Sequence, residues 1–534
     1  MNNLILHFKA SVIMMICLTC ALNSNAYDLV QDGIYYRIHK SYNKYASVTY
    51  GDNQNNSYSG DVVIPPTVTY EGEEYNVTII GQYAFSGCTQ LNSVTIPNTV
   101  YLIGTESFKN CSIRSIVLPS SVTQIGSNTF SGCTNLTNVV FSPNLFFIHV
   151  GAFENCTSLT RVEFPASLTE LYSGAFSGCT GLTSVYIPST ITKITGNPFQ
   201  GCYNLESIVV SPDNPNYDSR NGCNAIIQKD GDVLMSTCPN TIVPESVKEI
   251  GFNAFSHQPN LTSVDLPEGV TTIGGYAFAY CPKLMSIDIP DSVRVIEQFA
   301  FAYDDNLRTV NLPDSLETLG YAAFAYCYNM PSIHLPNNIK NLDSQVFWVC
   351  SNLASANIPT SITSIPHGLF FNCTDMDNVV IPNNIKTISS SAFQNCVYMT
   401  NVSIGSGVES ISYRTFTNNY RLMDISCKAV TPPTITSEIF DDASYNQGTL
   451  YVRRQSVEAY RQANYWSKFK NIVGVDFPVD VNGDNVMNII DITVFLDMLL
   501  NNEPFKDMEL DANGDGAIDV ADVVEMVDMM LSGE

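Results

Sequence analysis

The chain has 534 residues, and its 51 acidic side chains outnumber its 25 basic side chains, which gives a formal net charge of −26 at pH 7. Such a negative surface repels polyanions, so nucleic acids and anionic membranes are excluded as partners. After the first 26 residues, no segment approaches the roughly 18 consecutive apolar residues that a membrane-spanning helix needs. We therefore expect no transmembrane segment.

The first 26 residues have the features of a signal peptide. Lys9 precedes an apolar run from Ala10 to Leu22, and the small-residue pattern Ser24-Asn25-Ala26 follows it. Residues 1–26 are therefore predicted to be removed during export. The mature protein is expected outside the cell or at the cell surface, with the periplasm as the alternative compartment.

A unit of about 23 residues repeats through most of the chain and is marked by one phenylalanine. This residue recurs at positions 85, 108, 130, 153, 176, 199, 255, 278, 301, 324, 347, 370, 393 and 416. The spacing predicts 14 repeats within residues 77–430, with a hairpin insertion at about 212–240. Residues 27–76 are predicted to form an N-terminal β cap and residues 431–476 a C-terminal cap, because the open ends of a repeat stack expose apolar core and strand edges.

Within the repeat, Leu91, Val94 and Ile96 alternate as a strand with one buried face, and Pro97 ends the strand. Val100, Ile103 and Phe108 then lead the chain back across the core. One repeat buries too little apolar surface to offset its own backbone entropy, so the repeats must stack. We expect a β-rich solenoid in which equivalent strands form one long parallel sheet, with little helix.

The repeat resembles the BspA-like leucine-rich repeat proteins of anaerobic bacterial surfaces. The resemblance rests on units such as IPNTVYLIGTESFKNC and LPEGVTTIGGYAFAYC, and on the entry and exit segments that flank the repeats. It implies a leucine-rich repeat solenoid that binds extracellular-matrix or host glycoproteins. In the exit segment, Val457, Tyr460, Tyr465, Trp466 and Phe469 predict an amphipathic helix that closes the stack.

Most cysteines follow the repeat. Eleven of the 14 mature cysteines lie three residues after a marker phenylalanine, where stacked thiols are too far apart and wrongly directed to pair. We expect buried, unpaired thiols at these positions. Cys223 and Cys238 differ because they flank the predicted hairpin turn Lys229-Asp230-Gly231-Asp232 at equal distances. A disulfide and a pair of free thiols both remain open for these two.

The C-terminal module, residues 477–534, holds 14 acidic residues against the single base Lys506. It contains DVNGDNVMNIID and, 31 residues later, DANGDGAIDVAD. Each segment places oxygen ligands at the positions by which an EF-hand-like loop wraps Ca²⁺, with an apolar helix after it. Two calcium ions are predicted, with the ligands Asp480, Asn482, Asp484, Val486, Asn488 and Asp491 in the first loop and Asp511, Asn513, Asp515, Ala517, Asp519 and Asp522 in the second.

The duplicated loop and helix resemble a dockerin, with aspartate rather than glutamate at the last loop position. The resemblance implies docking to a cohesin-bearing scaffold protein through loop positions 10 and 11, which are Ile489, Ile490, Val520 and Ala521 here. These apolar pairs depart from the Ser-Thr pairs of many dockerins, so the cohesin class stays open.

No catalytic constellation stands apart from the repeat pattern, so we expect a binding protein and not an enzyme. Tyr280, Tyr303 and Tyr326 occupy one position in three consecutive repeats and are expected to stack as a column. They form a candidate ligand surface, with packing only against one another as the alternative. Exposed strand positions define a second candidate surface of polar character: Thr95, Glu163, Tyr186, Asp265, Asp288, Asn311, His334 and Asn357.

Three hypotheses follow. The chain is an adhesin-like secreted or surface protein whose tail docks to a cohesin-like partner. Alternatively, it is a non-catalytic accessory component of a cellulosome-like polysaccharide-degrading complex. A third hypothesis makes the tail a calcium-dependent cap without a partner.

Overall fold

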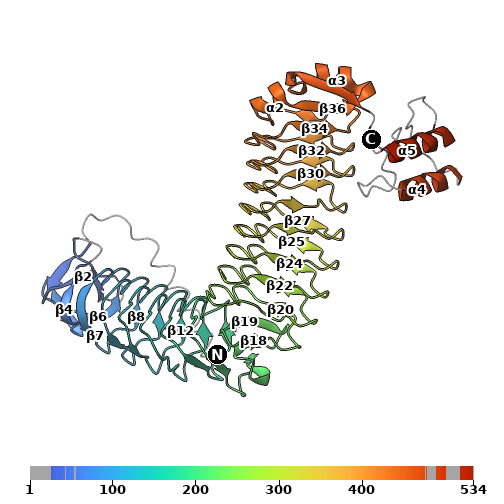
Figure 1. Ribbon diagram of the computed structural model, residues 1–534. Coiled ribbons are helices and arrows are strands. Elements are labelled where there is room, and N and C mark those ends of the chain that lie inside the picture. The colour runs from blue at the N-terminus through green and yellow to red at the C-terminus, as the bar shows by residue number, and fades with distance from the viewer. Residues whose placement is uncertain are drawn as a thin grey trace. The chain divides into compact units, whose positions relative to one another are not determined.

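The computed structural model describes residues 26–41, 44–52, 56–475, 477, 489–500 and 518–532, the last five without their side chains. Nearly all of the predicted signal peptide lies outside these residues. The chain divides into two compact units, Met1–Pro215 and Asn216–Glu534. Figure 1 shows stacked coils of short strands in both units.

The first unit begins with antiparallel strands that cover the end of the stack. β1 (Leu29–Gln31), β2 (Ile34–His39) and β3 (Tyr45–Thr49) pair in order, and β5 (Thr67–Tyr70) pairs with β6 (Glu73–Ile80). β3 also pairs with β6 in parallel, and β6 continues into the repeats through β8 (Leu102–Ile103). These strands lie within the entry segment, whose capping role stays a prediction.

Most coils of the first unit contribute a front strand and a shorter return strand. The paired front strands are β4 (Ser59–Val63) with β7 (Gln90–Thr95), β9 (Ser115–Val117) with β11 (Asn138–Val140), and β14 (Ser184–Ile187) with β16 (Ser207–Val210). The return strands that follow β8 are β10 (Gln124–Ile125), β12 (Phe147–Ile148), β13 (Glu170–Leu171) and β15 (Lys193–Ile194).

The second unit opens with β17 (Tyr217–Asp218) and the antiparallel hairpin of β18 (Ala225–Gln228) and β19 (Val233–Thr237). Its return strands continue from β19 through β20 (Glu249–Ile250), β21 (Thr272–Ile273), β23 (Val295–Ile296), β25 (Thr318–Leu319) and β27 (Asn341–Leu342). A separate sheet holds β29 (Ser364–Ile365), β31 (Thr387–Ile388), β33 (Ser410–Ile411) and β35 (Thr434–Ile435).

The front strands of the second unit form two pairs and one longer sheet. The pairs are β22 (Ser286–Asp288) with β24 (Thr309–Asn311), and β26 (Ser332–Ile333) with β28 (Ser355–Ala356). The longer sheet is β30 (Asn378–Ile381), β32 (Asn401–Ile404), β34 (Asp424–Cys427), β36 (Thr449–Arg453) and β37 (Asn471–Val475).

The predicted β solenoid with parallel strands and little helix is confirmed, but its strand pairing differs from the single long sheet that we expected. The front strands pair only in short groups. The longer ladders are made by the return strands, which are mostly two residues long. A strand of two residues has no alternation of polar and apolar positions, so the sequence pattern could not reveal it.

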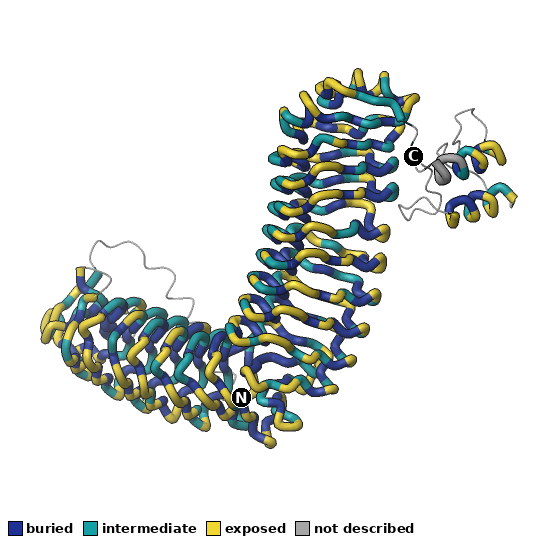
Figure 2. Tube along the Cα trace, in the orientation of Figure 1, coloured by how far each residue is buried: buried dark blue, intermediate teal, exposed yellow. Residues whose placement is uncertain are grey.

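The core contains a stack of the marker phenylalanines, all of which are buried. Figure 2 shows that buried residues recur in every part of the stacked coils. Adjacent rings are nearly parallel; the centroids of Phe278 and Phe301, for example, are 5.2 Å apart. In the second unit the stack ends at Phe440, against which Trp466 and Phe469 pack. The exit segment contains α2 (Asp442–Gln447) and α3 (Val457–Gln462), so the closing helix is shorter than the expected amphipathic segment.

The expected buried, unpaired cysteines are also confirmed, because all 14 cysteines in the described part of the chain are buried and free. In the repeats, each thiol three residues after a marker phenylalanine, except that of Cys88, donates to the carbonyl of the marker phenylalanine one coil earlier. The Sγ–O distance is 2.8 Å from Cys111 to Phe85 and 3.0 Å from Cys350 to Phe324. The cysteine ladder therefore satisfies main-chain carbonyls in the core.

Candidate functional site

The candidate tyrosines occupy a position of the coil that has a left-handed backbone. Two residues after each marker phenylalanine, φ is positive, as in Gly132 (73°), Asn395 (63°) and Tyr303 (64°). Glycine or asparagine fills this position throughout the first unit and in the last three repeats of the second unit. The exceptions are His257, Tyr280, Tyr303, Tyr326 and Val349.

Bulky side chains at this position carry a backbone cost of roughly 1–2 kcal/mol per residue, because Cβ crowds the following carbonyl. The rings offset part of this cost by stacking. The centroids of Tyr280 and Tyr303 lie 4.5 Å apart with 5° between the ring planes, and Tyr303 and Tyr326 are also 4.5 Å apart. Such contacts stabilise by about 0.5–1.5 kcal/mol each, so stacking alone does not explain five consecutive substitutions.

The phenol group of Tyr303, at the centre of the column, stays protonated over the physiological range. Burial, followed by the neighbouring Tyr280 and Tyr326, raises the pKa of Tyr303 to about 12. The Tyr280 residue is 39% exposed, while Tyr303 and Tyr326 are half-buried. The column thus presents ring edges and hydroxyl groups that both donate and accept hydrogen bonds.

A second aromatic column, which was not predicted from the sequence, lies beside the first. Tyr276 stacks on Phe299 at 4.8 Å, and Phe252 and Tyr321 make edge contacts at the two ends. Between the columns the coils carry alanines, and Ala302 and Ala325 are buried against rings from both columns and Trp348. We call the combined surface the aromatic face: Phe252, His257, Tyr276, Tyr280, Phe299, Tyr303, Tyr321, Tyr326 and Trp348.

The predicted row of front-strand residues is mostly exposed, as expected for Tyr186 and Asp288. Asn357 is the exception, because its side chain donates to the Leu335 carbonyl and accepts from the Leu335 amide. The row is less polar than we predicted. In the first unit it also contains exposed valines, at positions 63, 117, 140 and 209.

The hairpin cysteines are free thiols in the structure. The strands pair Gln228 with Val233 at the turn, but a bulge between Ile226 and Ile227 shifts the register by one residue. Cys238 is therefore not opposite Cys223, and its thiol donates to the Asn224 carbonyl at 3.3 Å. Equal spacing from the turn had suggested a direct cross-strand pair.

The C-terminal module contains α4 (Ile489–Leu500) and α5 (Val520–Ser532). The helices pack through Ile492 and Phe495 on one side and Val523 and Met526 on the other. These pairs are 31 residues apart in sequence, as are the predicted ligands Asp491 and Asp522. Both aspartates are completely buried in the first turn of their helices.

Only the last residues of the second predicted loop, from Ile518 to Asp522, belong to the described part of the chain. The Asp519 amide donates to Asp522 Oδ2 at 2.8 Å, and Asp519 Oδ1 accepts from the Ala521 amide. In the described part of the chain, no three acidic, histidine or cysteine side chains converge as a metal site requires. Nine predicted ligands lie outside the described residues: Asp480, Asn482, Asp484, Val486, Asn488, Asp511, Asn513, Asp515 and Ala517.

The predicted docking residues of the module are all at the surface. Ile489 is 62% exposed and Val520 is 63% exposed, and Ile490 and Ala521 are exposed as well. Among the described helices, none combines the length and apolar character needed to cross a membrane.

Comparison with known proteins gave matches of fold and of family. A leucine-rich cell surface protein from Faecalibacterium prausnitzii is 27% identical, with 67% of this chain and 95% of that chain covered and a TM-score of 0.47. A leucine-rich repeat protein from Bacteroides ovatus is 21% identical, with 84% and 100% covered and a TM-score of 0.39. The pneumococcal vaccine antigen PcpA is 16% identical, with 85% and 100% covered and a TM-score of 0.42.

The search of curated proteins gave no match. The family model of the BspA type leucine-rich repeat region matches residues 73–180, 144–221, 235–354, 295–423 and 340–460. These segments together span more than half of the 534 residues. The chain therefore belongs to the BspA-type leucine-rich repeat family.

Proposed function

We propose that this protein is an exported, adhesin-like binding protein that holds protein partners, including host glycoproteins, on its aromatic face. One observation supports this proposal. At a position with a left-handed backbone, where most other coils have glycine or asparagine, four coils have an aromatic residue: His257, Tyr280, Tyr303 and Tyr326. Strained side chains concentrate where function requires them. Tyrosine and tryptophan are also the residues that most often dominate protein–protein binding energy.

The test replaces the tyrosines by the residue that neighbouring coils use. In Asn372, Asn395 and Asn418 the same position forms an amide ladder, with Asn395 Nδ2 donating to Asn372 Oδ1 at 2.7 Å. The triple variant Tyr280→Asn, Tyr303→Asn and Tyr326→Asn should therefore fold. It is expected to bind immobilised host glycoproteins at least about tenfold more weakly than the parent chain.

The matched control is Asn372→Gly, which changes the same position outside the aromatic face. Surface plasmon resonance on one panel of glycoproteins compares the three chains, and circular dichroism verifies their folding. Equal affinities for the parent chain and the folded tyrosine variant would remove the aromatic face from the proposal.

We further propose that the C-terminal module binds two calcium ions and docks to a cohesin-like protein. Two completely buried carboxylates, Asp491 and Asp522, favour this function, since a buried charge requires compensation by a cation or by hydrogen bonds. The donor set of carboxylate and amide oxygens suits Ca²⁺, which would neutralise the clustered acids and link each loop to its helix.

Calcium binding is tested by titration calorimetry of the full chain after treatment with EGTA. We expect two sites in the parent chain and one in Asp522→Asn, with Asp497→Asn, an exposed acid of α4, as the control that retains both. Absence of measurable calcium binding would contradict the calcium proposal without affecting the aromatic face.

Docking is tested separately by Ile489→Asp combined with Val520→Asp, which alters the exposed pairs and spares the calcium ligands. This variant should bind calcium and lose cohesin-like partners in a pull-down. Recovery of a scaffold that carries polysaccharide-degrading enzymes would favour the alternative function as an accessory component of a cellulosome-like complex.

A further inference from the structure

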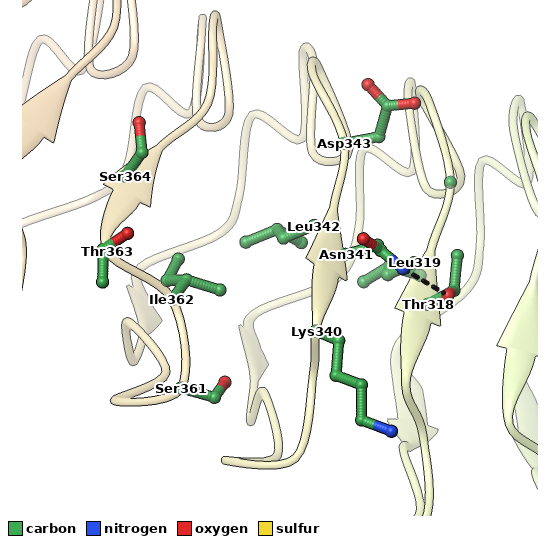
Figure 3. A pocket seen from close by; sticks show the side chains of 11 residues that line it. Thr318, Leu319, Lys340, Asn341, Leu342, Asp343, Ser361, Ile362, Thr363 and Ser364 are labelled. Atoms are coloured by element: carbon green, nitrogen blue, oxygen red, sulfur yellow. Dashed lines mark hydrogen bonds between the residues drawn. The ribbon is translucent and has the colours of Figure 1, made fainter.

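The return ladder of the second unit is interrupted at one place. Return strands pair continuously from β17 to β27 and again from β29 to β35, but in the described residues no pairing joins β27 to β29. Figure 3 shows the two strands standing apart, with the side chains of Leu342 and Ile362 between them.

Pro366 explains the interruption. In neighbouring coils the residue after the return strand donates its amide to the strand of the preceding coil. The distances are 3.0 Å from Asp343 N to Leu319 O and 3.0 Å from Ser389 N to Ile365 O. Pro366 occupies this position in its own coil and has no N–H to donate to Leu342 O.

The interruption opens a cleft of about 490 Å³. Lys340, Asn341 and Asp343 line one wall, and Ser361, Thr363 and Ser364 line the other. The cleft reaches the core of the solenoid. Leu342 is only half-buried, whereas its equivalents Leu319 and Ile365 are completely buried.

The walls of the cleft are open strand edges. By the register of the intact pairs, the β27 edge faces the cleft with Lys340 O, Leu342 N and Leu342 O. The β29 edge faces it with the amide and carbonyl of Ser364. Donors and acceptors that alternate at the spacing of a strand are complementary to a polypeptide main chain.

We propose that the cleft is a binding site for an extended peptide segment, which adds to the open strand edges and places an aliphatic side chain against Leu342 and Ile362. Main-chain hydrogen bonds supply part of the affinity, and the apolar floor selects the side chain. Lys340 Nζ is paired with Glu317 at 2.8 Å, so the open strand edges and the apolar floor, rather than charge, define the peptide. The site shares no residue with the aromatic face and does not depend on the proposed function.

The test uses the full chain and a blocked, fluorescein-labelled peptide with the sequence of residues 383–391, Asn-Asn-Ile-Lys-Thr-Ile-Ser-Ser-Ser. In the chain this segment forms β31, which pairs with the opposite edge of β29. Fluorescence anisotropy should show saturable binding of this peptide and none of a scrambled version.

Pro366→Ser restores the missing amide donor and is expected to close the ladder and weaken peptide binding at least tenfold. The matched control is Ser389→Ala, at the same position of the next coil, where the amide is already paired. Leu342→Gln removes the apolar floor without altering the ladder, and it should also weaken binding if Pro366→Ser does not fold.

Hydrogen exchange provides a second readout in the free parent chain. The amides of Leu342 and Ser364 should exchange fast, whereas the amides of Leu319 and Thr387 should exchange slowly. Addition of the peptide should slow the exchange of the Leu342 and Ser364 amides. Slow exchange at Leu342 and Ser364 without peptide would overturn the proposal, as would affinity unchanged in both Pro366→Ser and Leu342→Gln. Binding of oligosaccharides in place of the peptide would overturn it as well.

Discussion

At the residue scale, the side chain at the cysteine position of the repeat forms hydrogen bonds with the main chain of the preceding coil. Asn419 fills this position without a thiol: its Oδ1 accepts from the Cys396 amide at 2.8 Å, and its Nδ2 donates to the Phe393 carbonyl at 2.9 Å. Asp304 occupies the same position in an earlier coil. Its Oδ1 accepts from the Cys281 amide at 2.7 Å, but its buried Oδ2 has no hydrogen-bond partner.

We infer that Asp304 is protonated in the folded protein, with its Oδ2 hydroxyl directed to the Phe278 carbonyl as Nδ2 of Asn419 is to Phe393. Burial raises the pKa of Asp304 well above its usual value. In the unfolded chain the carboxyl ionises near pH 3.9. Its contribution to stability is therefore fully present below that pH and is lost as the pH rises toward the folded-state pKa.

The substitution Asp304→Asn should remove this pH dependence and stabilise the protein at neutral pH. We expect the free energy of unfolding to rise by up to about 4 kcal/mol at pH 7, because keeping a carboxyl protonated costs ~1.4 kcal/mol for each pH unit above its unfolded-state pKa, and the asparagine amide makes the same hydrogen bond without that cost. Urea unfolding at pH 7 and pH 4 measures the difference from the parent chain. A difference that does not shrink at the lower pH would contradict a neutral Asp304.

At the scale of elements, the caps decide whether the ends of the phenylalanine stack are protected. Trp466 is buried over Phe440, and its Nε1 donates to the Pro433 carbonyl at 2.8 Å. Tyr460 is buried beside it and donates to the Ala429 carbonyl. These side chains come from α3 and the short turn after it.

Trp466→Ala should therefore destabilise the last coils by about 3–5 kcal/mol, the usual cost of removing a large buried aromatic side chain. Hydrogen exchange should accelerate first in β34, β36 and β37. The control Trp348→Ala removes a half-buried tryptophan and should cost less. Unchanged exchange in these three strands would show that the exit segment does not cap the stack.

The elements also show what the sequence could predict. Marker spacing and the alternation of Leu91, Val94 and Ile96 predicted the coils and front strands, because burial imposes that pattern. The return strands were not predicted, because a strand of two residues is too short to show a periodic pattern of apolar residues. The hairpin was predicted, but the bulge at Ile226 was not, because it depends on pairing with β19 and leaves no local signal. Pro366 was visible in the sequence, yet its effect appears only when neighbouring coils are compared.

At the scale of the whole molecule, the repeat explains the fold and its exceptions indicate the binding surfaces. The first aromatic column was predicted from Tyr280, Tyr303 and Tyr326, whereas the second column was not. Tyr276 and Phe299 occupy the same position of their coils, but Tyr321 lies one residue earlier in its coil. The second column therefore has no constant spacing in the sequence that would reveal it. The left-handed backbone that makes these tyrosines unusual is also invisible without the structure.

The C-terminal module adds a prediction at this scale. Its apolar cluster consists of residues from α4, α5 and the adjoining Ile518. We therefore expect EGTA to change the helical signal of the module and to leave the melting temperature of the solenoid unchanged. Calorimetry of the full chain with and without calcium measures this. A lower melting temperature of the solenoid in EGTA would favour the third hypothesis, a calcium-dependent cap.

The central claim, that the aromatic face binds protein partners, is tested most directly by hydrogen exchange on a complex with a glycoprotein from the binding panel. We predict that protection increases in the turns around residues 257, 280, 303 and 326 and not along the front strands. Protection confined to the front strands, with the aromatic turns unchanged, would contradict the claim.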